Sequence, residues 1–202
     1  MEPHKMIIGV PKEIQPREKR IALVPRGVEA LRKMGFTVLV ESKAGIHSDY
    51  GNPKYEEVGA EIITDTAELW SRSDIIVKVS PPTPHEVGLL KNEGTIISFF
   101  YPDKHGELLQ QLSAKKATVL AMDCIPRITR AQKMDALSSM ANVAGYRAVI
   151  EAAYAFPYFF TGQVTAAGKI KPAKVLIIGG GVAGLSDRKS VVEGKSVDLG
   201  GR

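Results

Sequence analysis

Three glycines near the end of the chain have a spacing that could bind phosphate groups. Gly179, Gly181 and Gly184 directly follow an apolar run of β-forming residues, 175–178. In a strand–turn–helix unit with this spacing, the first glycine allows a tight turn, the second lets the backbone approach a pyrophosphate, and the third lets the helix pack on its strand. The free N–H groups and the dipole at the start of that helix favour an anion. The pattern predicts a dinucleotide site made by Gly179, Gly181, Val182, Ala183 and Gly184.

Four polar residues upstream of this turn could orient the reacting ring of a bound cofactor: Arg127, Gln132, Asp135 and Ser138. Hydride transfer depends mainly on orientation, because the cofactor carries the chemistry and the reacting carbons must approach to about 3–3.5 Å. Asp135 and Ser138 are three residues apart and so share a helix face, with Gln132 on the same side. Spacing alone leaves a structural interpretation open. Thr129 would then be the N-cap, Gln132 would complete a capping box, and Asp135 would be a first-turn acid. Ser138 would be a solvated polar residue.

The elements that must position these residues alternate along the first 121 residues. Short β-like runs occur at residues 6–10, 37–41, 61–63, 75–79, 95–100 and 118–121, and helical patterns at 26–34, 67–70, 86–90 and 104–115. Several of the β-like runs lack polar alternation, as strands covered on both faces should. This alternation predicts an α/β fold with a Rossmann-like parallel sheet.

A different pattern follows, with alanines and other apolar residues at three- and four-residue spacing from 130 to 156. It predicts one long helix, either an ordinary core helix or one that connects two domains. We therefore expect an N-terminal α/β domain at 1–129, a connecting helix at 130–160, and the start of a second, NAD-binding Rossmann domain at 161–185.

Residues 186–202 break the expected pattern, because an apolar, alanine-rich helix should follow the glycine turn. The stretch resembles one reading frame of a common sequencing-library adapter, and we expect it to be an artefactual tail. A βαβ unit needs roughly 30 residues or more, so the second domain is expected to be incomplete here. The acidic residue that binds the adenosine ribose about 20 residues after the motif has no counterpart.

Composition excludes several classes of protein. The formal net charge is +5 and the pI about 9.2, but the basic residues are interspersed with acids, which argues against nucleic acid as a partner. A single cysteine, Cys124, excludes an internal disulfide and is expected in the core. The four histidines lack metal-ligand spacing, so no metal is predicted. No apolar run approaches the ~20 residues of a membrane span, and no secretory signal is expected.

Three segments carry a resemblance to a known family. They are Pro11-Lys12-Glu13 with Arg20-Ile-Ala-Leu-Val-Pro25, the run 126–149, and the run 159–169 before the glycine turn. The first resembles the N-terminal domain that alanine dehydrogenase shares with nicotinamide nucleotide transhydrogenase. The other two are similar to domain I, the NAD(H)-binding component of proton-translocating transhydrogenase.

The resemblance implies a function for the parent protein: hydride transfer between NAD(H) and NADP(H), coupled to proton translocation. Arg127, Asp135 and Ser138 would hold the nicotinamide carboxamide and nearby cofactor groups, and Gln132 would reach the second nucleotide. NADP(H) would lie on a partner domain, and a membrane domain and a second copy of the chain are further expected partners. The location would be the cytoplasmic face of a bacterial inner membrane, or the matrix face of the mitochondrial one.

Two departures argue against the alanine dehydrogenase branch. That branch is expected to carry a substrate-handling lysine where this chain has Ser80, and a catalytic histidine where it has Pro102. Lys78 and His105 lie nearby and could substitute, and Arg20 is retained. An alanine dehydrogenase-type amino-acid oxidoreductase therefore stays as an alternative. A further alternative is a truncated, non-catalytic remnant, since this chain alone is expected to be inactive.

Overall fold

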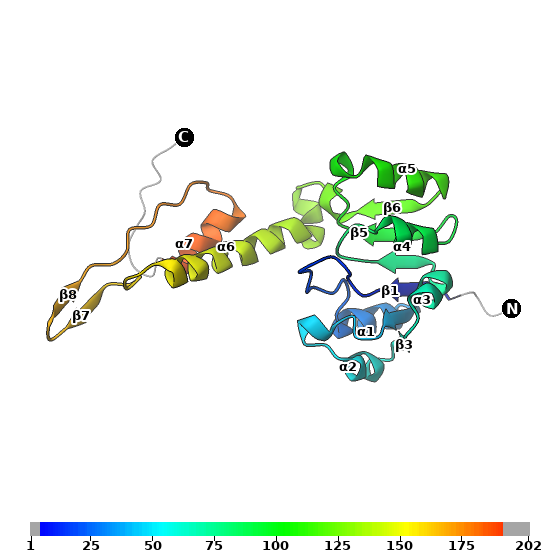
Figure 1. Cartoon of the computed structure of the whole chain (residues 1–202), viewed down its shortest axis with the longest axis horizontal. Coiled ribbons are helices and arrows are strands. Elements are labelled where there is room, and N and C mark those ends of the chain that lie inside the picture. Colours follow the sequence, from blue (N-terminus) through cyan, green and yellow to red (C-terminus); the bar gives the residue numbers. More distant parts are fainter. Residues whose placement is uncertain (1–4, 192–202) are drawn as a thin grey trace. The chain divides into compact units, whose positions relative to one another are not determined.

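The computed structural model of the chain describes residues 5–191, with side chains through residue 186 (Figure 1). Contacts divide the chain into two compact units, Met1–Arg127 and Ile128–Arg202. The division lies two residues before the domain boundary expected at 129/130. Each unit is described by itself below.

The first unit is built on a six-stranded parallel sheet (Figure 1). Its strands are β1 Ile7–Val10, β2 Thr37–Glu41, β3 Glu61–Ile63, β4 Ile75–Val77, β5 Thr95–Ser98 and β6 Thr118–Ala121. The order across the sheet is β3-β2-β1-β4-β5-β6. The predicted Rossmann-like α/β fold is thereby confirmed. The chain adds strands toward one edge from β1 to β3 and toward the other edge from β4 to β6, so the strand order reverses between β1 and β4. Sheets of this kind bind ligands at that point.

Helices cover both faces of this sheet. They are α1 Pro25–Lys33, α2 Asn52–Glu57, α3 Thr66–Arg72, α4 Pro84–Leu89 and α5 Gly106–Ala114, with short 3₁₀ turns η1 Ile46–Ser48, η2 Pro102–Lys104 and η3 Met122–Cys124. Along β2, Val38 and Val40 pack in one core with residues of α1 and α2, while Leu39 packs in the other with residues of α3, α4 and α5. Alternate residues thus face opposite layers, which explains the uninterrupted apolar strands.

Buried or partly buried acids fix the loops at the carboxyl end of the sheet. Glu13 follows β1, Glu41 ends β2 and Asp123 follows β6. Glu41 accepts hydrogen bonds from the Lys12 N–H and the Thr66 hydroxyl, both 2.8 Å. The other donors are the N–H groups of Val79 and Ser80 to Glu13, at 2.6 and 3.2 Å, and of Phe100 and Tyr101 to Asp123, at 2.5 and 3.0 Å. The loops after β4 and β5 are therefore held by side chains that follow other strands.

The second unit contains η4 Thr129–Met134, α6 Ala136–Ala155, the antiparallel hairpin of β7 Gln163–Thr165 and β8 Gly168–Ile170, and α7 Val182–Val191 (Figure 1). The prediction of one helix over 130–156 is wrong at its start, since residues 129–134 form 3₁₀ turns and α6 begins six residues later than expected. Within residues 5–191, no helix combines the length and apolarity that crossing a membrane requires.

The strand expected at residues 175–178 is absent, and this prediction is wrong for the structure. Residues 171–180 adopt neither helix nor strand, and Leu176 and Ile178 are 83% and 92% exposed. A parallel strand is stabilised by hydrogen bonds to a neighbouring strand, and the strands described in this unit, β7 and β8, pair with each other. Of the expected tail, residues 186–191 continue α7, and 192–202 lie outside the described residues.

Candidate functional site

Asp135 and Ser138 meet at the start of α6. Asp135 is the N-cap residue, and its carboxylate accepts a hydrogen bond from the Ser138 N–H at 2.9 Å. The Ser138 hydroxyl donates to the other carboxylate oxygen at 2.6 Å. An acid is favoured here because it satisfies an unpaired N–H and complements the helix dipole. The expected pairing of these residues is present, but Asp135 precedes the helix instead of lying in its first turn.

The alternative capping arrangement at Thr129 is wrong. The residue before η4 is Ile128, and no side chain caps this turn, so Gln132 forms no capping box. Gln132 is exposed within η4, which is anchored by the buried side chain of Ala131. Arg127 is exposed and ends the first unit, whereas Gln132 belongs to the second. Gln132 is thus left free of the capping role.

The predicted glycine turn leads into α7. Gly179 has φ +118°, a conformation that L side chains rarely adopt. A Cβ built on Gly184 would lie 2.2 Å from the carbonyl oxygen of Gly179, so this position has no room for a side chain. α7 begins at Val182, followed by Ala183. The first and third glycines are therefore required by local geometry, while Gly181 has open space around it.

α7 packs closely on α6, and the specific contact between them was not predicted from the sequence. A Cβ on Gly145 would lie 2.2 Å from the carbonyl oxygen of Ala183, and the Ser186 hydroxyl donates to the carbonyl oxygen of Asn142 at 2.9 Å. The signal in the sequence is the run of small residues through the long helix, which permits close approach. Gly145 therefore fixes the start of α7, and with it the glycine turn, against α6.

A polar cluster follows β4 in the first unit. The side chains of Lys78 and Glu86 are 0% and 4% exposed and form an ion pair. The other Glu86 oxygen accepts a hydrogen bond from the Thr83 N–H at 2.7 Å, within a capping box at the start of α4. Lys78 is consequently not free to replace the lysine missing at position 80. The buried pair was not recognised from the sequence, although Thr83 and Glu86 have capping-box spacing.

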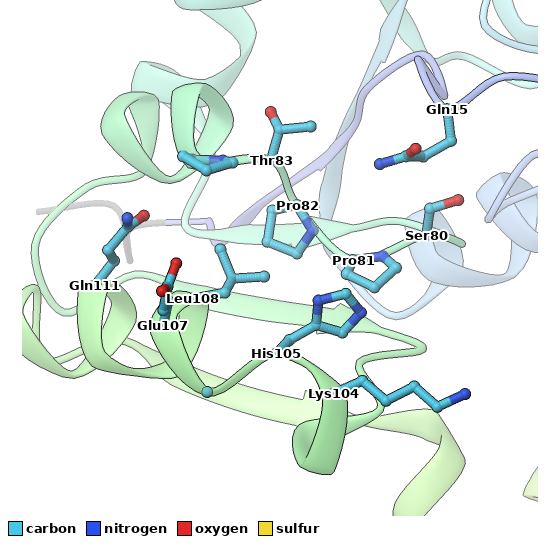
Figure 2. Close-up of a pocket in the computed structure, with 12 residues that line it drawn as sticks. Gln15, Ser80, Pro81, Pro82, Thr83, Lys104, His105, Glu107, Leu108 and Gln111 are labelled. Carbon is cyan, nitrogen blue, oxygen red and sulfur yellow. The ribbon is translucent and has the colours of Figure 1, made fainter.

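A pocket of about 670 Å³ lies beside this cluster (Figure 2). One wall is the loop of Ser80 to Pro84, and Lys104 and His105 belong to the opposite wall. Figure 2 shows the His105 side chain pointing toward the prolines of that loop. The His105 ring is also in edge contact with the Phe100 ring, with centroids 6.4 Å apart. His105, unlike Lys78, therefore remains accessible to a small molecule.

Comparison with known proteins gives consistent matches over both units. Residues 9–144 match the family described as "Alanine dehydrogenase/PNT, N-terminal domain", and residues 148–193 match the corresponding C-terminal domain. NAD(P) transhydrogenase subunit alpha of Haemophilus influenzae is 53% identical over 90% of this chain, and alanine dehydrogenase of Bacillus subtilis is 36% identical over 93%. The crystal structure of transhydrogenase from Sinorhizobium meliloti matches with a TM-score of 0.88 and 38% identity over 92% of the chain.

The chain spans only part of each of these relatives. The matched region is 35% of the Haemophilus subunit, 49% of the Bacillus enzyme and 55% of the Sinorhizobium chain. The N-terminal family match alone includes more than half of the present sequence. The chain therefore belongs to the alanine dehydrogenase/PNT family.

Proposed function

We propose that this chain is the N-terminal part of a subunit of proton-translocating NAD(P) transhydrogenase, which transfers hydride between NAD(H) and NADP(H). The observation that carries this proposal is the 53% identity to a transhydrogenase alpha subunit, against 36% to the alanine dehydrogenase of Bacillus. The burial of Lys78 in an ion pair supports the same choice, because its amine is not free to replace the lysine missing at position 80.

The nicotinamide end of NAD(H) is assigned to the residues around the start of α6. Arg127, Asp135 and Ser138 hold the carboxamide and nearby groups, and Gln132 reaches toward the second nucleotide. The exposure of Gln132 and the paired side chains of Asp135 and Ser138 support these roles. The reaction needs orientation in a shielded site, with cofactors that supply the chemistry when bound.

The pyrophosphate of NAD(H) is assigned to the start of α7. Its proposed ligands are the turn and first helical residues, Gly179, Gly181, Val182, Ala183 and Gly184. The N–H groups of a first helical turn have no partner within the helix, and the dipole favours an anion there. The positive φ of Gly179 and the tight position of Gly184 support a preformed turn.

The proposed partners are an NADP(H)-binding domain and a membrane domain of the same complex, with a second copy of this chain forming a homodimer. Membership in a family that includes transhydrogenase subunits supports the first two. The proposed location is the cytoplasmic face of a bacterial inner membrane, or the mitochondrial matrix face in a eukaryote.

Resequencing the source locus from the codon of Gly179 would test whether residues 186–202 are an artefactual tail.

The test is hydride transfer by the protein that the complete gene encodes, mixed with an NADP(H)-binding partner component. NADH-dependent reduction of NADP⁺ is expected, and Gln132→Asn should slow transfer far more than it weakens NADH binding. Equal losses in rate and affinity would remove the proposed role of Gln132. Absence of any transfer despite tight NADH binding would contradict the transhydrogenase assignment.

Two alternatives make different predictions. An amino-acid dehydrogenase would reduce NAD⁺ when alanine is added, and accessible His105 beside the pocket is the observation that favours this candidate. Loss of this alanine-dependent reduction in His105→Ala would identify His105 as the base. The truncated, non-catalytic remnant is tested on the 202-residue chain itself, where absence of NADH binding would favour it.

A further inference from the structure

We infer that Gly145 is a positioning residue for hydride transfer. Because it has no side chain, it sets the separation between the pyrophosphate site at the start of α7 and the nicotinamide site at the start of α6. This inference rests on the function proposed above. It concerns a residue that is not itself a proposed ligand of the cofactor and that acts through the backbone of α7.

Gly145 lies where α7 packs on α6 (Figure 1). It is buried, whereas its neighbours Ala144 and Tyr146 are exposed. A Cβ built on Gly145 would lie 2.2, 2.9 and 3.0 Å from the carbonyl oxygen, carbonyl carbon and Cα of Ala183. All three are backbone atoms, so no rotation of a side chain could make room. The first turn of α7 lies this close to α6 only because residue 145 is glycine.

The backbone atoms at this contact belong to the proposed pyrophosphate site. Ala183 is the second residue of α7. The Leu185 N–H donates to the carbonyl oxygen of Gly181 at 2.9 Å, and Gly184 packs against the carbonyl oxygen of Gly179 with no room for a side chain. This hydrogen bond and this contact tie the glycine turn to the helix. A displacement of Ala183 therefore carries the whole turn with it.

α6 connects this contact to the proposed nicotinamide site. Ser138 and Gly145 are seven residues apart, so they lie on nearly the same face of the helix and about 10 Å apart along its axis. The turns between them contain no proline and belong to one continuous helix, Ala136–Ala155, so this spacing is fixed. In the dinucleotide, one ribose joins the nicotinamide ring to the pyrophosphate. The two sites must therefore have a separation that matches this covalent link.

One added methyl group at position 145 would change that separation. Ordinary van der Waals separation is about 3.5 Å, so a contact of 2.2 Å forces the start of α7 to move away from α6 by about 1 Å. A misplacement of about 1 Å far from the chemistry can slow a reaction about 100-fold. The glycine turn itself stays intact, because it moves together with α7.

The experiment compares two ligands on the protein that the complete gene encodes. NADH spans both sites, whereas ADP-ribose contains the pyrophosphate but no nicotinamide. In Gly145→Ala the affinity for ADP-ribose should stay within about 2-fold of wild type, while NADH should bind about 10-fold more weakly, because its two ends no longer fit both sites at once. Hydride transfer to NADP⁺ at saturating NADH, with the NADP(H)-binding partner component present, should be about 100-fold slower.

Gly88→Ala is the matched control. Gly88 also lies within a helix, α4, and beyond its own helix and its chain neighbours no atom lies within 4 Å of a Cβ built on it. This variant should leave both affinities and the rate unchanged. Gly184→Ala provides the contrast, because it disturbs the turn itself and should weaken ADP-ribose and NADH to the same extent.

The outcomes separate this inference from the proposed function. A loss of NADH affinity or of rate in Gly145→Ala, with ADP-ribose binding retained, supports the positioning role. Equal losses for both ligands, including those of a variant that does not fold, would assign Gly145 a purely structural role and overturn the inference. So would wild-type affinities together with a wild-type rate, although NAD(H) binding would stand in both cases. If the wild type binds neither ligand, the proposed function fails and the inference fails with it.

Discussion

The ion pair of Lys78 and Glu86 gives the sharpest prediction about stability. Both side chains are almost completely buried, and Glu86 also accepts from the Thr83 N–H. Removing one partner of a buried pair leaves an uncompensated charge and typically costs about 3–5 kcal/mol. Lys78→Met should lower the free energy of unfolding by about 4 kcal/mol, because the charge of Glu86 remains buried without a partner. Glu86→Gln should lie near 3 kcal/mol, because the glutamine carbonyl can still accept from Lys78 or from Thr83.

The double variant Lys78→Met/Glu86→Gln should cost only about 1–2 kcal/mol, since no buried charge remains. The assay is urea unfolding followed by the fluorescence of Trp70, the single tryptophan, which packs in the same core as Val87 of α4. The exposed pair Lys33 and Glu29 provides the control, with side chains 73% and 49% exposed. Lys33→Met should change the free energy of unfolding by less than about 1 kcal/mol. Additive costs in the double variant, or single costs as small as the control, would refute the reasoning.

Three further predictions concern single positions. Burial raises the pKa of Tyr55 to about 12, so its neutral form stabilises the fold below pH ~10, and this contribution is lost between pH ~10 and ~12. Absorbance titration should show a tyrosine transition near pH 12 that Tyr55→Phe removes, and a curve that Tyr55→Phe leaves unchanged above pH ~10 would contradict this. Gly145→Ala should cost about 1–3 kcal/mol by overpacking α7 on α6, measured by thermal unfolding, and an unchanged midpoint would argue against close packing. Gly184→Ala should weaken NADH binding by disturbing the turn, measured by fluorescence titration, whereas Gly180→Ala, which has open space, should weaken it less.

The strands of the first unit could be predicted well because a strand buried on both faces requires an uninterrupted run of apolar residues in the sequence. Residues 37–41, 61–63 and 118–121 form strands with the expected bounds. The runs beginning at Ile75 and Thr95 were expected to extend two residues further than they do. At those ends the backbone N–H groups turn toward the carboxylates of Glu13 and Asp123, 66 and 23 residues away along the chain. Hydrogen bonds between residues so far apart leave no periodic pattern in the sequence, so these strand ends could not be predicted.

The start of the long helix was misplaced for a local reason. Residues 129–134 have helix-compatible side chains, and only the capping geometry of Asp135 shows where α6 begins. The strand predicted at 175–178 is missing for a non-local reason. Its β-forming residues cannot make a parallel ladder without a neighbouring strand. Cys124 was expected in the core but is exposed in η3. Which residues form the NAD(H) site stays a prediction, while the pairing of Asp135 with Ser138 and the tight glycine turn are properties of the structure.

The acids at the carboxyl end of the sheet occupy backbone N–H groups of the first unit that an anion could otherwise bind. Glu13 and Asp123 each occupy two consecutive backbone N–H groups, and such pairs elsewhere form concave receptors for phosphate. A phosphate approaching these loops would meet negative charge and donors already in use. The first turn of α7 has no such acid in its sequence. The chain thus fills two donor pairs with its own side chains, whereas the first turn of α7 is the anion site proposed above, so competition by inorganic phosphate is expected to act on the second unit.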